Sequence, residues 1–593
     1  MQGSRTMGSR RLSPKDYIVA DRIEYTTIRE MLIASMKQYN DHILYRHKVN
    51  GSYVTYTYSD VFTRASAFGM VLQNKYAIRK GDRIALYSEN RPEWCIAYIG
   101  LIIIGAVVVP IDAQALESDV LHILNHAEVS LICVSKKTSD NVINIIQHAK
   151  KCKNIVSFDE AVTTKKVVSF SESINTIRTT ELKEITVQPH DSAEILYTSG
   201  TTGVSKAVIL SQGNIIEDIK SICSMVRFTP DDVFLEILPI HHVFEGTCSF
   251  LLSIYRGSAV TIAESYNPKN IVANIKETKV SIILAVPLLF EKIYNNITRA
   301  VQSRGIIIKV FFNTIMLMTR FARIVLKMKI GRHTFNWLRK KAGLASIRFV
   351  VAGGGPLPLY VAQGFDDIGI TILQGYGLTE TSPVISVSTL EYNEYRSVGL
   401  PIPGVEVKID RPNNESIGEI CCRGPIVMQG YYKDIKATQQ VIDNEGWFHT
   451  GDLGYIDDTG FVYITGRCKN LIVTHGGKNV YPEEIEMKLN KSPFILESMV
   501  YGQAESETIQ GERVCTLIVP DYEAIETYSA EHMIHYETDE DIEMLIKSEI
   551  RKVSSQLPVY KRIVKFSLHA EPFRKTSTKK IKRYLYSSTL QKV

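Results

Sequence analysis

Short β-branched runs alternate with longer helical patterns over residues 80–300 of this 593-residue chain, and this alternation constrains the fold more than any other feature. Strands that alternate with helices in this way form parallel sheets whose faces are covered by helices. We therefore predict an α/β fold with a large N-terminal domain of layered sheets and helices. The predicted strands are Arg83–Tyr87, Val107–Pro110, Leu131–Val134, Ala259–Ile262 and Ile282–Val286.

The pattern changes at about residue 400. Short strand-like segments there are separated by turn residues, as in Arg411–Asn414 and Asp457–Gly460. Such spacing is typical of a small antiparallel unit. We predict a β-rich subdomain over about 400–466.

The last part of the chain mixes helices and strands. A helix opens at Pro482, a strand covers Val514–Val519, and a second helix lies near Asp539–Val553. We predict an α+β domain over residues 468–593, which places the N-terminal domain at residues 1–467.

Composition excludes several classes of protein. The net charge of +6 is spread over the chain and gives no concentrated basic footprint, so we expect no nucleic-acid partner. The nine cysteines form no C-x-x-C pair, which argues against structural zinc or a disulfide framework and favours a cytoplasmic location. The most apolar stretch, Cys95–Pro110, is shorter than the roughly 20 residues that a membrane span needs. We predict a buried helix–strand unit there.

A loop rich in glycine and hydroxyl residues lies between two β-rich runs within Ala193–Ser211. Glycines allow backbone N–H groups to approach an anion closely, hydroxyls add donors, and a terminal lysine adds positive charge. The loop lacks the spacing of a Walker motif, but it predicts phosphate binding. The candidate residues are Thr198, Ser199, Gly200, Thr201, Thr202, Gly203 and Lys206.

This loop and five later motifs, in the same order, resemble the adenylate-forming superfamily, which includes acyl-CoA synthetases, luciferases and peptide-synthetase adenylation domains. The resemblance covers nearly the whole chain. The later motifs are Leu238–Phe244, Ala352–Leu357 with Gly353, Gly354 and Gly355, Gln374–Thr381 with Gly375 and Gly377, Trp447–Asp452, and Gly466–Asn470.

The resemblance implies roles for residues in these motifs. Tyr376 offers a flat face to adenine, and Thr379 is placed to hold the α-phosphate. Glu380 is the predicted ligand of Mg²⁺, a hard cation that prefers oxygen. Asp452 is suited to the ribose hydroxyls, with Arg467 as its donor partner.

His242, in the Pro–His–aromatic motif, is the predicted residue that orients the incoming carboxylate. A structural role for this histidine is the alternative.

The tail Phe573–Arg583 resembles the family's terminal motif, which carries a catalytic lysine. Alignment of the motif puts that lysine at Lys580, with Lys579 as the alternative because it replaces the usual glycine. The resemblance also implies that the C-terminal domain is a mobile lid that swings about a hinge at Lys469. Gly476 and Gly477 would then border a channel for coenzyme A.

Together these features predict activation of a carboxylic acid with ATP to acyl-AMP, followed by thioester formation with coenzyme A. A medium- or long-chain fatty acid is favoured because Gly476–Glu484 looks like the same segment in long-chain fatty acyl-CoA synthetases. The implied cofactors are ATP, Mg²⁺ and coenzyme A. The alternatives are an acyl-AMP ligase or acyl-acyl carrier protein synthetase, a P-loop kinase or ATPase, and a membrane-binding protein without catalysis.

The tract Arg304–Arg348 contains eleven basic residues and no Asp or Glu, with bulky apolar residues between them. A helix could sort these residues into two faces and lie in a membrane interface. We hypothesise a peripheral contact on the inner face of a membrane, through which the apolar acid reaches the enzyme. The alternative is a core helix whose charged side chains extend outward.

Overall fold

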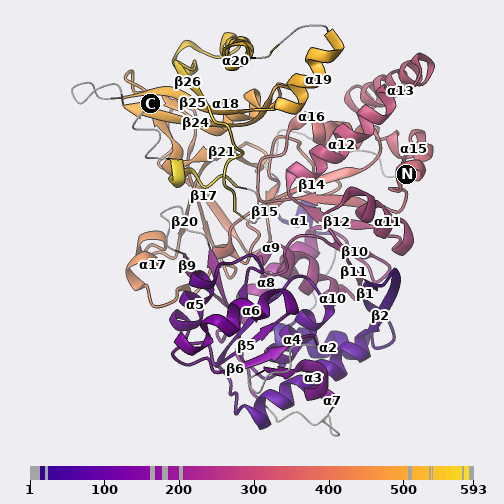
Figure 1. The fold of residues 1–593 in the computed structure, drawn as a ribbon, viewed down its shortest axis with the longest axis vertical. Coiled ribbons are helices and arrows are strands. Elements are labelled where there is room, and N and C mark those ends of the chain that lie inside the picture. Colours follow the sequence, from indigo (N-terminus) through magenta and orange to yellow (C-terminus); the bar gives the residue numbers. More distant parts are fainter. Residues whose placement is uncertain are drawn as a thin grey trace.

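The structure, a computed structural model, describes residues 12, 14–19, 24–159, 167–175, 185–198, 205–326, 328–504, 511–532, 536, 538–576 and 580–586. Within them the chain forms two large sheets, a small antiparallel sheet and a C-terminal α+β unit (Figure 1). The predicted α/β fold is confirmed.

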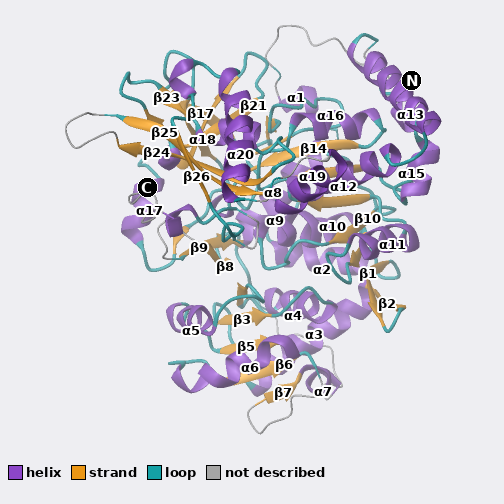
Figure 2. Cartoon of the chain, turned by 45° about the horizontal axis from the view of Figure 1, so that its top comes forward, coloured by secondary structure: helices purple, strands orange, loops and turns teal. Residues whose placement is uncertain are grey.

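An eight-stranded sheet occupies the N-terminal part. Its central strands run parallel, because helices return the chain to the same end of the sheet. Helices α3 (Tyr58–Lys75), α5 (Glu117–His126) and α6 (Lys136–Ile145) lie beside it (Figure 2). In spatial order the strands are β19 (Gly430–Tyr431), β9 (Lys206–Ser211), β8 (Ser192–Thr198), β4 (Val107–Ile111), β3 (Arg83–Tyr87), β5 (Leu131–Val134), β6 (Asn154–Ser157) and β7 (Val167–Ser169).

The second large sheet has nine strands and carries the other nucleotide motifs at its strand ends. Its central strands, from β11 to β14, are parallel, and ligands of such sheets bind beyond the carboxyl ends of the strands. In spatial order the strands are β16 (Leu400–Pro401), β15 (Ser386–Val387), β14 (Thr371–Tyr376), β13 (Phe349–Ala352), β12 (Ile282–Ala285), β10 (Val233–Glu236), β11 (Ala259–Ile262), β1 (Ile43–Val49) and β2 (Ser52–Thr57).

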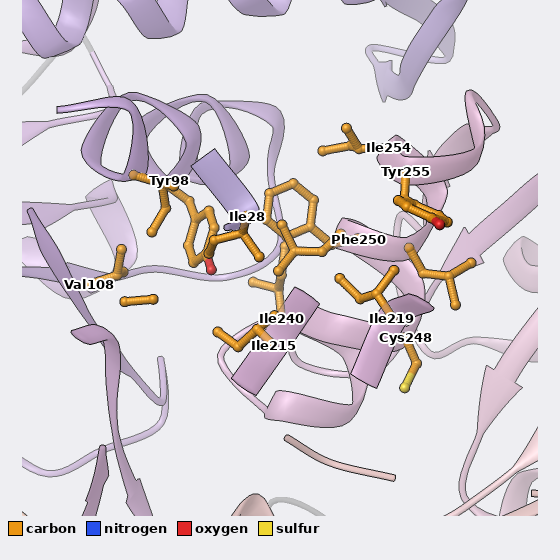
Figure 3. Close-up of a cluster of buried hydrophobic side chains, with 14 of the residues drawn as sticks. Ile28, Tyr98, Val108, Ile215, Ile219, Ile240, Cys248, Phe250, Ile254 and Tyr255 are labelled. Atoms are coloured by element: carbon orange, nitrogen blue, oxygen red, sulfur yellow. The ribbon is translucent and has the colours of Figure 1, made fainter. Parts of the chain in front are cut away.

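Helices between the two sheets share one hydrophobic core. Helix α4 (Pro92–Ile103) begins at a proline, the residue suited to the first helical position, and nearly all of its side chains are buried. Its Tyr98 packs with residues of α2 (Ile28–Gln38), α8 (Gln212–Met225) and the π-helical turn η2 (Gly246–Leu251), as Figure 3 shows. The same cluster reaches Val108 of the first sheet and Phe234 of the second.

A four-stranded antiparallel sheet follows, with the order β17 (Glu406–Asp410), β18 (Gly418–Arg423), β20 (Phe448–Ile456) and β21 (Val462–Arg467). The register of β20 and β21 pairs Asp452 with Arg467 directly across the ladder. Directly opposed residues have neighbouring side chains.

The C-terminal part has its own three-stranded sheet, β24 (Ile495–Ala504), β25 (Glu512–Pro520) and β26 (Lys565–Leu568). A separate hydrophobic cluster holds this sheet to α18 (Pro482–Leu489) and α20 (Asp539–Ser555). The hairpin of β22 (Ile472–Val473) and β23 (Asn479–Val480) joins the same cluster through Ile472 and Val480.

The structure describes twelve further helices, which are given at the end of this paragraph. None of the helices that the structure describes is long and apolar enough to cross a membrane. The remaining helices are α1 (Pro14–Tyr17), α7 (Phe170–Asn175), α9 (Val243–Glu245), α10 (Leu252–Arg256), α11 (Pro268–Thr278), α12 (Pro287–Gln302), α13 (Ile306–Ile324), α14 (Gly331–Thr334), α15 (Asn336–Ala342), α16 (Leu359–Asp367), α17 (Ile435–Val441) and α19 (Tyr522–His532).

Candidate active site

One cleft of about 2650 Å³ gathers most of the residues that the motifs predicted. Its walls come from the loops that follow β10, β13 and β14, from strands β20 and β21, and from α18 and the tail around Lys580. The cleft is therefore built by the N-terminal sheets and the C-terminal unit together.

Asp452 is held in the cleft by a tyrosine and an arginine. Tyr376 donates its phenolic proton to Asp452 Oδ2 at 2.9 Å, and Arg467 Nε lies 2.8 Å from Asp452 Oδ1. Burial raises the pKa of Asp452, while the charge of Arg467 and the Tyr376 hydrogen bond act in the opposite direction. The arrangement fixes a carboxylate acceptor beside the tyrosine ring.

Lys580 reaches the same place from the C-terminal unit. Its backbone is fixed in a tight turn, since Thr576 N donates to Lys580 O at 2.8 Å and Lys580 N donates to Thr576 Oγ1 at 3.1 Å. Lys580 is exposed to solvent in the cleft. Many protein atoms nevertheless surround its ammonium group. Partial desolvation lowers its pKa, with Arg467 adding to that effect.

Two acids oppose this shift. The charges of Asp452 and Glu380 raise the pKa of Lys580, and the charge of Lys580 in turn lowers the pKa of His242. The charge of Lys580 thus interacts with four predicted site residues, Arg467, Asp452, Glu380 and His242, which come from four different motifs. Lys579, the alternative catalytic lysine, lies outside the described residues.

Glu380 has a partner that the sequence motifs did not reveal. Tyr431, on the short strand β19, donates to Glu380 Oε1 at 2.9 Å. The ammonium group of Lys206 lies 4.3 Å from the centre of the same tyrosine ring, within the range of a cation–π contact. Tyr431 therefore connects the end of the phosphate loop with the predicted magnesium ligand, and Thr379 lies next to Glu380 in the short turn η3 (Thr379–Thr381).

The two histidines of the Pro–His–aromatic motif lie together at the start of α9. Their ring centroids are 4.2 Å apart, and His241 Nε2 is 3.6 Å from Asp112 Oδ2. Burial and the nearby charges of His241 and Lys580 hold the pKa of His242 well below its usual range. His242 is therefore neutral at physiological pH and can donate or accept a hydrogen bond.

Close contacts or backbone conformation require glycine in the loops that follow β13 and β14. A Cβ atom on Gly353 would lie 2.9 Å from the ring of Phe244, so the glycine loop packs directly against the histidine motif. Gly354 adopts a φ of +81°, which favours glycine, and Gly355 follows it in the cleft wall. A Cβ atom on Gly377 would lie 1.8 Å from Pro383 O.

Some predicted residues have other surroundings. The amide of Gln374 donates to the carbonyls of Tyr395 and Ser397, so it braces the β14 strand end, and Gly375 follows it in the cleft wall. Gly476 and Gly477 lie in the β22–β23 turn and are not among the residues that line the cleft.

The residues that precede this turn form the junction between the two parts of the protein. Lys469 is exposed in the turn η4 (Cys468–Asn470), at the edge of the cleft. The neighbouring Cys468 is the one exposed cysteine of the nine.

The predicted phosphate loop is described only at its two ends. Thr198 and Lys206 both line the cleft, and Thr198 Oγ1 donates to Lys206 O at 3.4 Å. Ser199, Gly200, Thr201, Thr202 and Gly203 lie outside the described residues.

Comparison with known proteins identifies relatives over most of the chain. Residues 33–432 match the family described as AMP-binding enzyme. Long chain acyl-CoA synthetase 7 of Arabidopsis thaliana, a peroxisomal protein, is 28% identical over 95% of this chain and 85% of its own length. A chloroplast protein of the same plant, long-chain-fatty-acid–[acyl-carrier-protein] ligase AEE15, is 26% identical over 90% of this chain and 81% of its own.

A solved structure shares the fold over nearly its whole length. The anthranilate CoA ligase AuaEII, in complex with anthranoyl-AMP, superposes with a TM-score of 0.76 and covers 98% of this chain and 99% of its own. The sequences of the two proteins are 18% identical, so this likeness establishes the fold alone.

Proposed function

The chain belongs to the family of AMP-binding enzymes, and on this premise we propose that it joins a fatty acid to coenzyme A through an acyl-AMP intermediate. The observation that carries the proposal is the convergence of Lys580, Asp452, Glu380 and His242 in one cleft. The position of Lys580, which the C-terminal unit brings close to Asp452, favours this proposal over a kinase or ATPase.

The first half-reaction needs positioning more than covalent chemistry. A carboxylate oxygen attacks the α-phosphorus of ATP, the bond to pyrophosphate breaks, and negative charge gathers on the phosphate oxygens. Lys580 supplies a fixed positive charge for the carboxylate and the α-phosphate. Asp452 accepts hydrogen bonds from the ribose, and the neutral His242 orients the incoming acid. Bound at Glu380, Mg²⁺ would neutralise charge on the phosphates.

The cleft also favours an apolar acid. Besides its polar wall, it is lined by buried aliphatic and aromatic side chains that belong to the core between the sheets. Removing an alkyl chain from water into such surroundings contributes about 0.8 kcal/mol per CH₂. The buried apolar residues of the lining include Ile222, Val226, Phe228, Leu284, Leu373 and Val384.

The second half-reaction requires the thiol of coenzyme A to reach the adenylate. We take the C-terminal unit, residues 468–593, to rotate about Lys469, which withdraws Lys580 and brings Gly476 and Gly477 to the cleft. Lys469 is exposed between the two parts, and neither glycine is among the residues that line the cleft in the present arrangement; both observations support such an exchange.

An acid panel tests the function. Saturated acids of increasing length are incubated with ATP and Mg²⁺, and pyrophosphate, AMP and ADP are measured with coenzyme A, with acyl carrier protein, or with no acceptor. We expect AMP and pyrophosphate, and a thioester only with coenzyme A. A thioester on the carrier protein alone would establish the alternative ligase, and ADP would refute adenylation.

The acid-free tract adds a proposal on substrate delivery: helix α13 rests on an anionic bilayer. Nine residues of the helix project within about 140° of one another at 100° per residue, and all but Thr314 are large apolar side chains that are exposed. Ile307 is 81% exposed and Leu317 is 68% exposed. Core helices do not leave such a face to water. In Figure 1 the helix lies at the periphery of the molecule.

Basic residues flank this apolar surface. Trp337 of α15 lies 6.5 Å from Phe311 between ring centroids, and Lys340 and Lys341 follow it on the same short helix, both exposed. Each basic residue near an anionic surface contributes about 1 kcal/mol. The opposite side of α13 packs on α12 and α16, and the first residues of these two helices line the cleft.

Other basic residues of the tract stabilise the fold instead. Arg323 donates to the buried Asp367 at 2.7 Å, and Arg339 donates to three backbone carbonyls. Arg348 pairs with the buried Asp232. A test of membrane binding therefore leaves these three arginines unchanged.

Sedimentation with anionic liposomes tests the contact. We expect salt-sensitive binding that is reduced at least tenfold in Phe311→Gln/Phe321→Gln and weakened in Lys340→Gln/Lys341→Gln. The double variant Ile435→Gln/Lys436→Gln is the matched control, because both residues are exposed at the start of α17 and neither is among those that line the cleft. Absence of wild-type binding, or equal binding by all variants, would refute the contact while leaving the reaction untouched.

A further inference from the structure

Three side chains that can each bind a metal ion lie together in the four-stranded antiparallel sheet. Glu419 and Cys421 are two residues apart on β18, and His449 of β20 pairs with Cys421 directly across the ladder. Residues two apart on a strand face the same side of the sheet, and directly opposed residues have neighbouring side chains. One oxygen, one sulfur and one nitrogen atom of the three groups lie within 4.8 Å of one another. The cysteine spacing gave no sign of this cluster, because its members meet only through the pairing of β18 with β20.

The spacing of the donor atoms suits a shared cation. His449 Nδ1 lies 2.9 Å from Glu419 Oε2 and 3.3 Å from Cys421 Sγ. A ring nitrogen either donates one hydrogen bond or accepts one, so Nδ1 cannot satisfy both neighbours. A tetrahedral zinc ion, with bonds of about 2.0 Å to nitrogen or oxygen and about 2.3 Å to sulfur, holds its ligand atoms roughly 3.3–3.6 Å apart. Shifts of about half an ångström or less would bring both distances into that range.

The other contacts of the histidine and the glutamate also favour a metal ion. Nε2, the second ring nitrogen of His449, lies 3.7 Å from Asp443 Oδ2. Metal-binding histidines almost always direct this second nitrogen to a carboxylate, a carbonyl or water, which orients the ring and fixes its tautomer. Gly451 N donates to Glu419 Oε1 at 2.9 Å, which holds the carboxylate in place and leaves Oε2 for the cation.

Two acids face each other beside the cluster. On the neighbouring strand β17, Asp410 is directly opposed to Glu419, and Lys408 is directly opposed to Cys421. Like charges in this arrangement destabilise a sheet. Asp410 has an ion-pair partner in Arg411, at 3.5 Å, but the side chain of that arginine is 93% exposed. A cation bound by Glu419 would offset the repulsion between the two acids.

The cleft gives a metal ion access to the cluster. Glu419 and His449 both line the cleft, and their side chains are 25% and 27% exposed. Cys421 is fully buried, but its sulfur atom is in contact with the accessible imidazole. An ion that enters from the cleft therefore meets the carboxylate and the imidazole first, and the thiol after them.

We propose that Glu419, Cys421 and His449 form a binding site for Zn²⁺ in the wall of the cleft. Thiolate, imidazole and carboxylate together suit this borderline-soft cation, whereas Mg²⁺ prefers oxygen ligands. Binding releases the thiol proton to solvent, because the ligand is the thiolate. Three protein ligands leave one tetrahedral position for water or another small ligand. The site is separate from the predicted magnesium ligand Glu380 and does not depend on the proposed reaction.

Metal titration of the full-length protein tests the site. The protein is treated with a chelator and dialysed, and Co²⁺ is then added as a spectroscopic probe in the presence of excess Mg²⁺. We expect one Co²⁺ per chain, a sulfur-to-cobalt charge-transfer band in the near ultraviolet, and displacement of Co²⁺ by Zn²⁺. In the absence of ATP and acid, Zn²⁺ should also raise Tm, because it binds the folded state.

Four variants identify the ligands. Cys421→Ser should lose the charge-transfer band, and both it and His449→Gln should bind Zn²⁺ at least roughly tenfold more weakly, since even the outer partners of metal ligands contribute about 10–100-fold. Cys422→Ser is the matched control, because Cys422 pairs with Phe448 and faces the other side of the same strand. Cys468→Ser removes the exposed thiol and should retain the band.

The wild-type titration decides the question even where a variant does not fold. Absence of the charge-transfer band in the wild type overturns the site. Retention of the band in a folded Cys421→Ser variant, with or without its loss in Cys468→Ser, overturns it as well, because another thiol then holds the metal. Pyrophosphate release in the acid panel is a separate measurement, so neither result bears on the proposed function.

Discussion

Individual side chains of the cleft depend on partners from distant parts of the sequence. Asp452 lies on β20, its donors Tyr376 and Arg467 on β14 and β21, and Lys580 approaches from the tail. The contacts of Asp452 with Tyr376 and Arg467 are short and directional, so single substitutions should have separable effects.

Lys580→Ala should mainly harm adenylation. Loss of one fixed transition-state donor typically lowers kcat by roughly 10²–10³-fold. Pyrophosphate release from a fatty acid should fall by that factor, whereas thioester formation from synthetic acyl-AMP should be nearly normal. Lys579→Ala is the matched control, and a larger defect in that variant would move the catalytic role by one residue.

Tyr431→Phe tests the link between Glu380 and the phosphate loop. The variant keeps the ring beneath Lys206 and removes only the hydrogen bond to Glu380. Groups that orient a metal ligand typically contribute 10–100-fold to metal affinity. We expect the Mg²⁺ concentration for half-maximal pyrophosphate release to rise roughly tenfold. Tyr432→Phe, whose ring contacts His126 instead, should behave as the wild type.

At the scale of elements, strand β8 and helix α4 meet through a buried acid. Tyr98 of α4 donates to Glu194 of β8, and burial raises the pKa of Glu194 to about 7. The helix and the strand are otherwise joined by apolar packing. This contact therefore makes the stability of the N-terminal sheet depend on pH.

Glu194→Gln should remove part of that dependence. The unfolded carboxyl ionises near about 4.3, whereas the folded one stays protonated up to about 7. The unfolded state therefore binds fewer protons in this window, and the free energy of unfolding falls as pH rises through it, by on the order of 3 kcal/mol. Glutamine keeps an acceptor for Tyr98 and does not ionise.

Urea unfolding at several pH values between 4.5 and 7.5 measures this effect. The variant should lose less stability than the wild type as pH rises. Glu391→Gln, at an exposed position, is the control. Parallel curves for the Glu194 variant and the wild type would contradict the assignment.

Sequence patterns predicted individual helices and strands better than they predicted contacts between distant segments. The run Val107–Val109 is confirmed as part of β4, and Pro482 begins α18 as expected. Local periodicity identifies such segments because one face of a helix or strand is buried along its whole length, so that apolar residues recur with the period of the element. Pairing between distant segments leaves no such signal. The two-residue strand β19, which carries Tyr431, exists because it pairs with β9 more than 200 residues earlier.

The candidate site was predictable where a motif fixes both identity and order. The structure brings Glu380, Asp452, Arg467 and Lys580 to one cleft, together with His242. The role of Tyr431 as the partner of Glu380 was not predictable, because only the pairing of β19 with β9 brings it to the cleft.

At the scale of the whole molecule, the cleft is shared by two parts with separate hydrophobic clusters. Ion pairs hold the tail to α18, including Arg583 with Glu486 at 2.5 Å. Asn470 in turn donates to Glu483 of the same helix at 2.6 Å. The C-terminal unit can therefore move as one body if the chain bends at the residues around Lys469.

Lys469→Pro should uncouple the two half-reactions. Proline fixes φ near about −65° and removes a backbone donor, so the hinge could hold one arrangement but not exchange it for another. We expect pyrophosphate release in a single turnover to survive and thioester formation to fall by at least tenfold. Lys469→Ala, which keeps the backbone free, is the control. Equal loss of both steps in a folded Lys469→Pro variant would argue against rotation.

The exposed thiol of Cys468 gives this chain a natural attachment point for a spectroscopic label. The other eight cysteines are buried, so a maleimide dye or spin label added under native conditions would react at one place, directly beside the pivot. Partial desolvation by neighbouring atoms, together with the charges of Glu419 and Asp452, raises the pKa of this thiol to about 11, so labelling is faster in mildly alkaline buffer. Motion at the hinge of the unmutated protein could thereby be followed as a change in the mobility of the probe during each catalytic cycle.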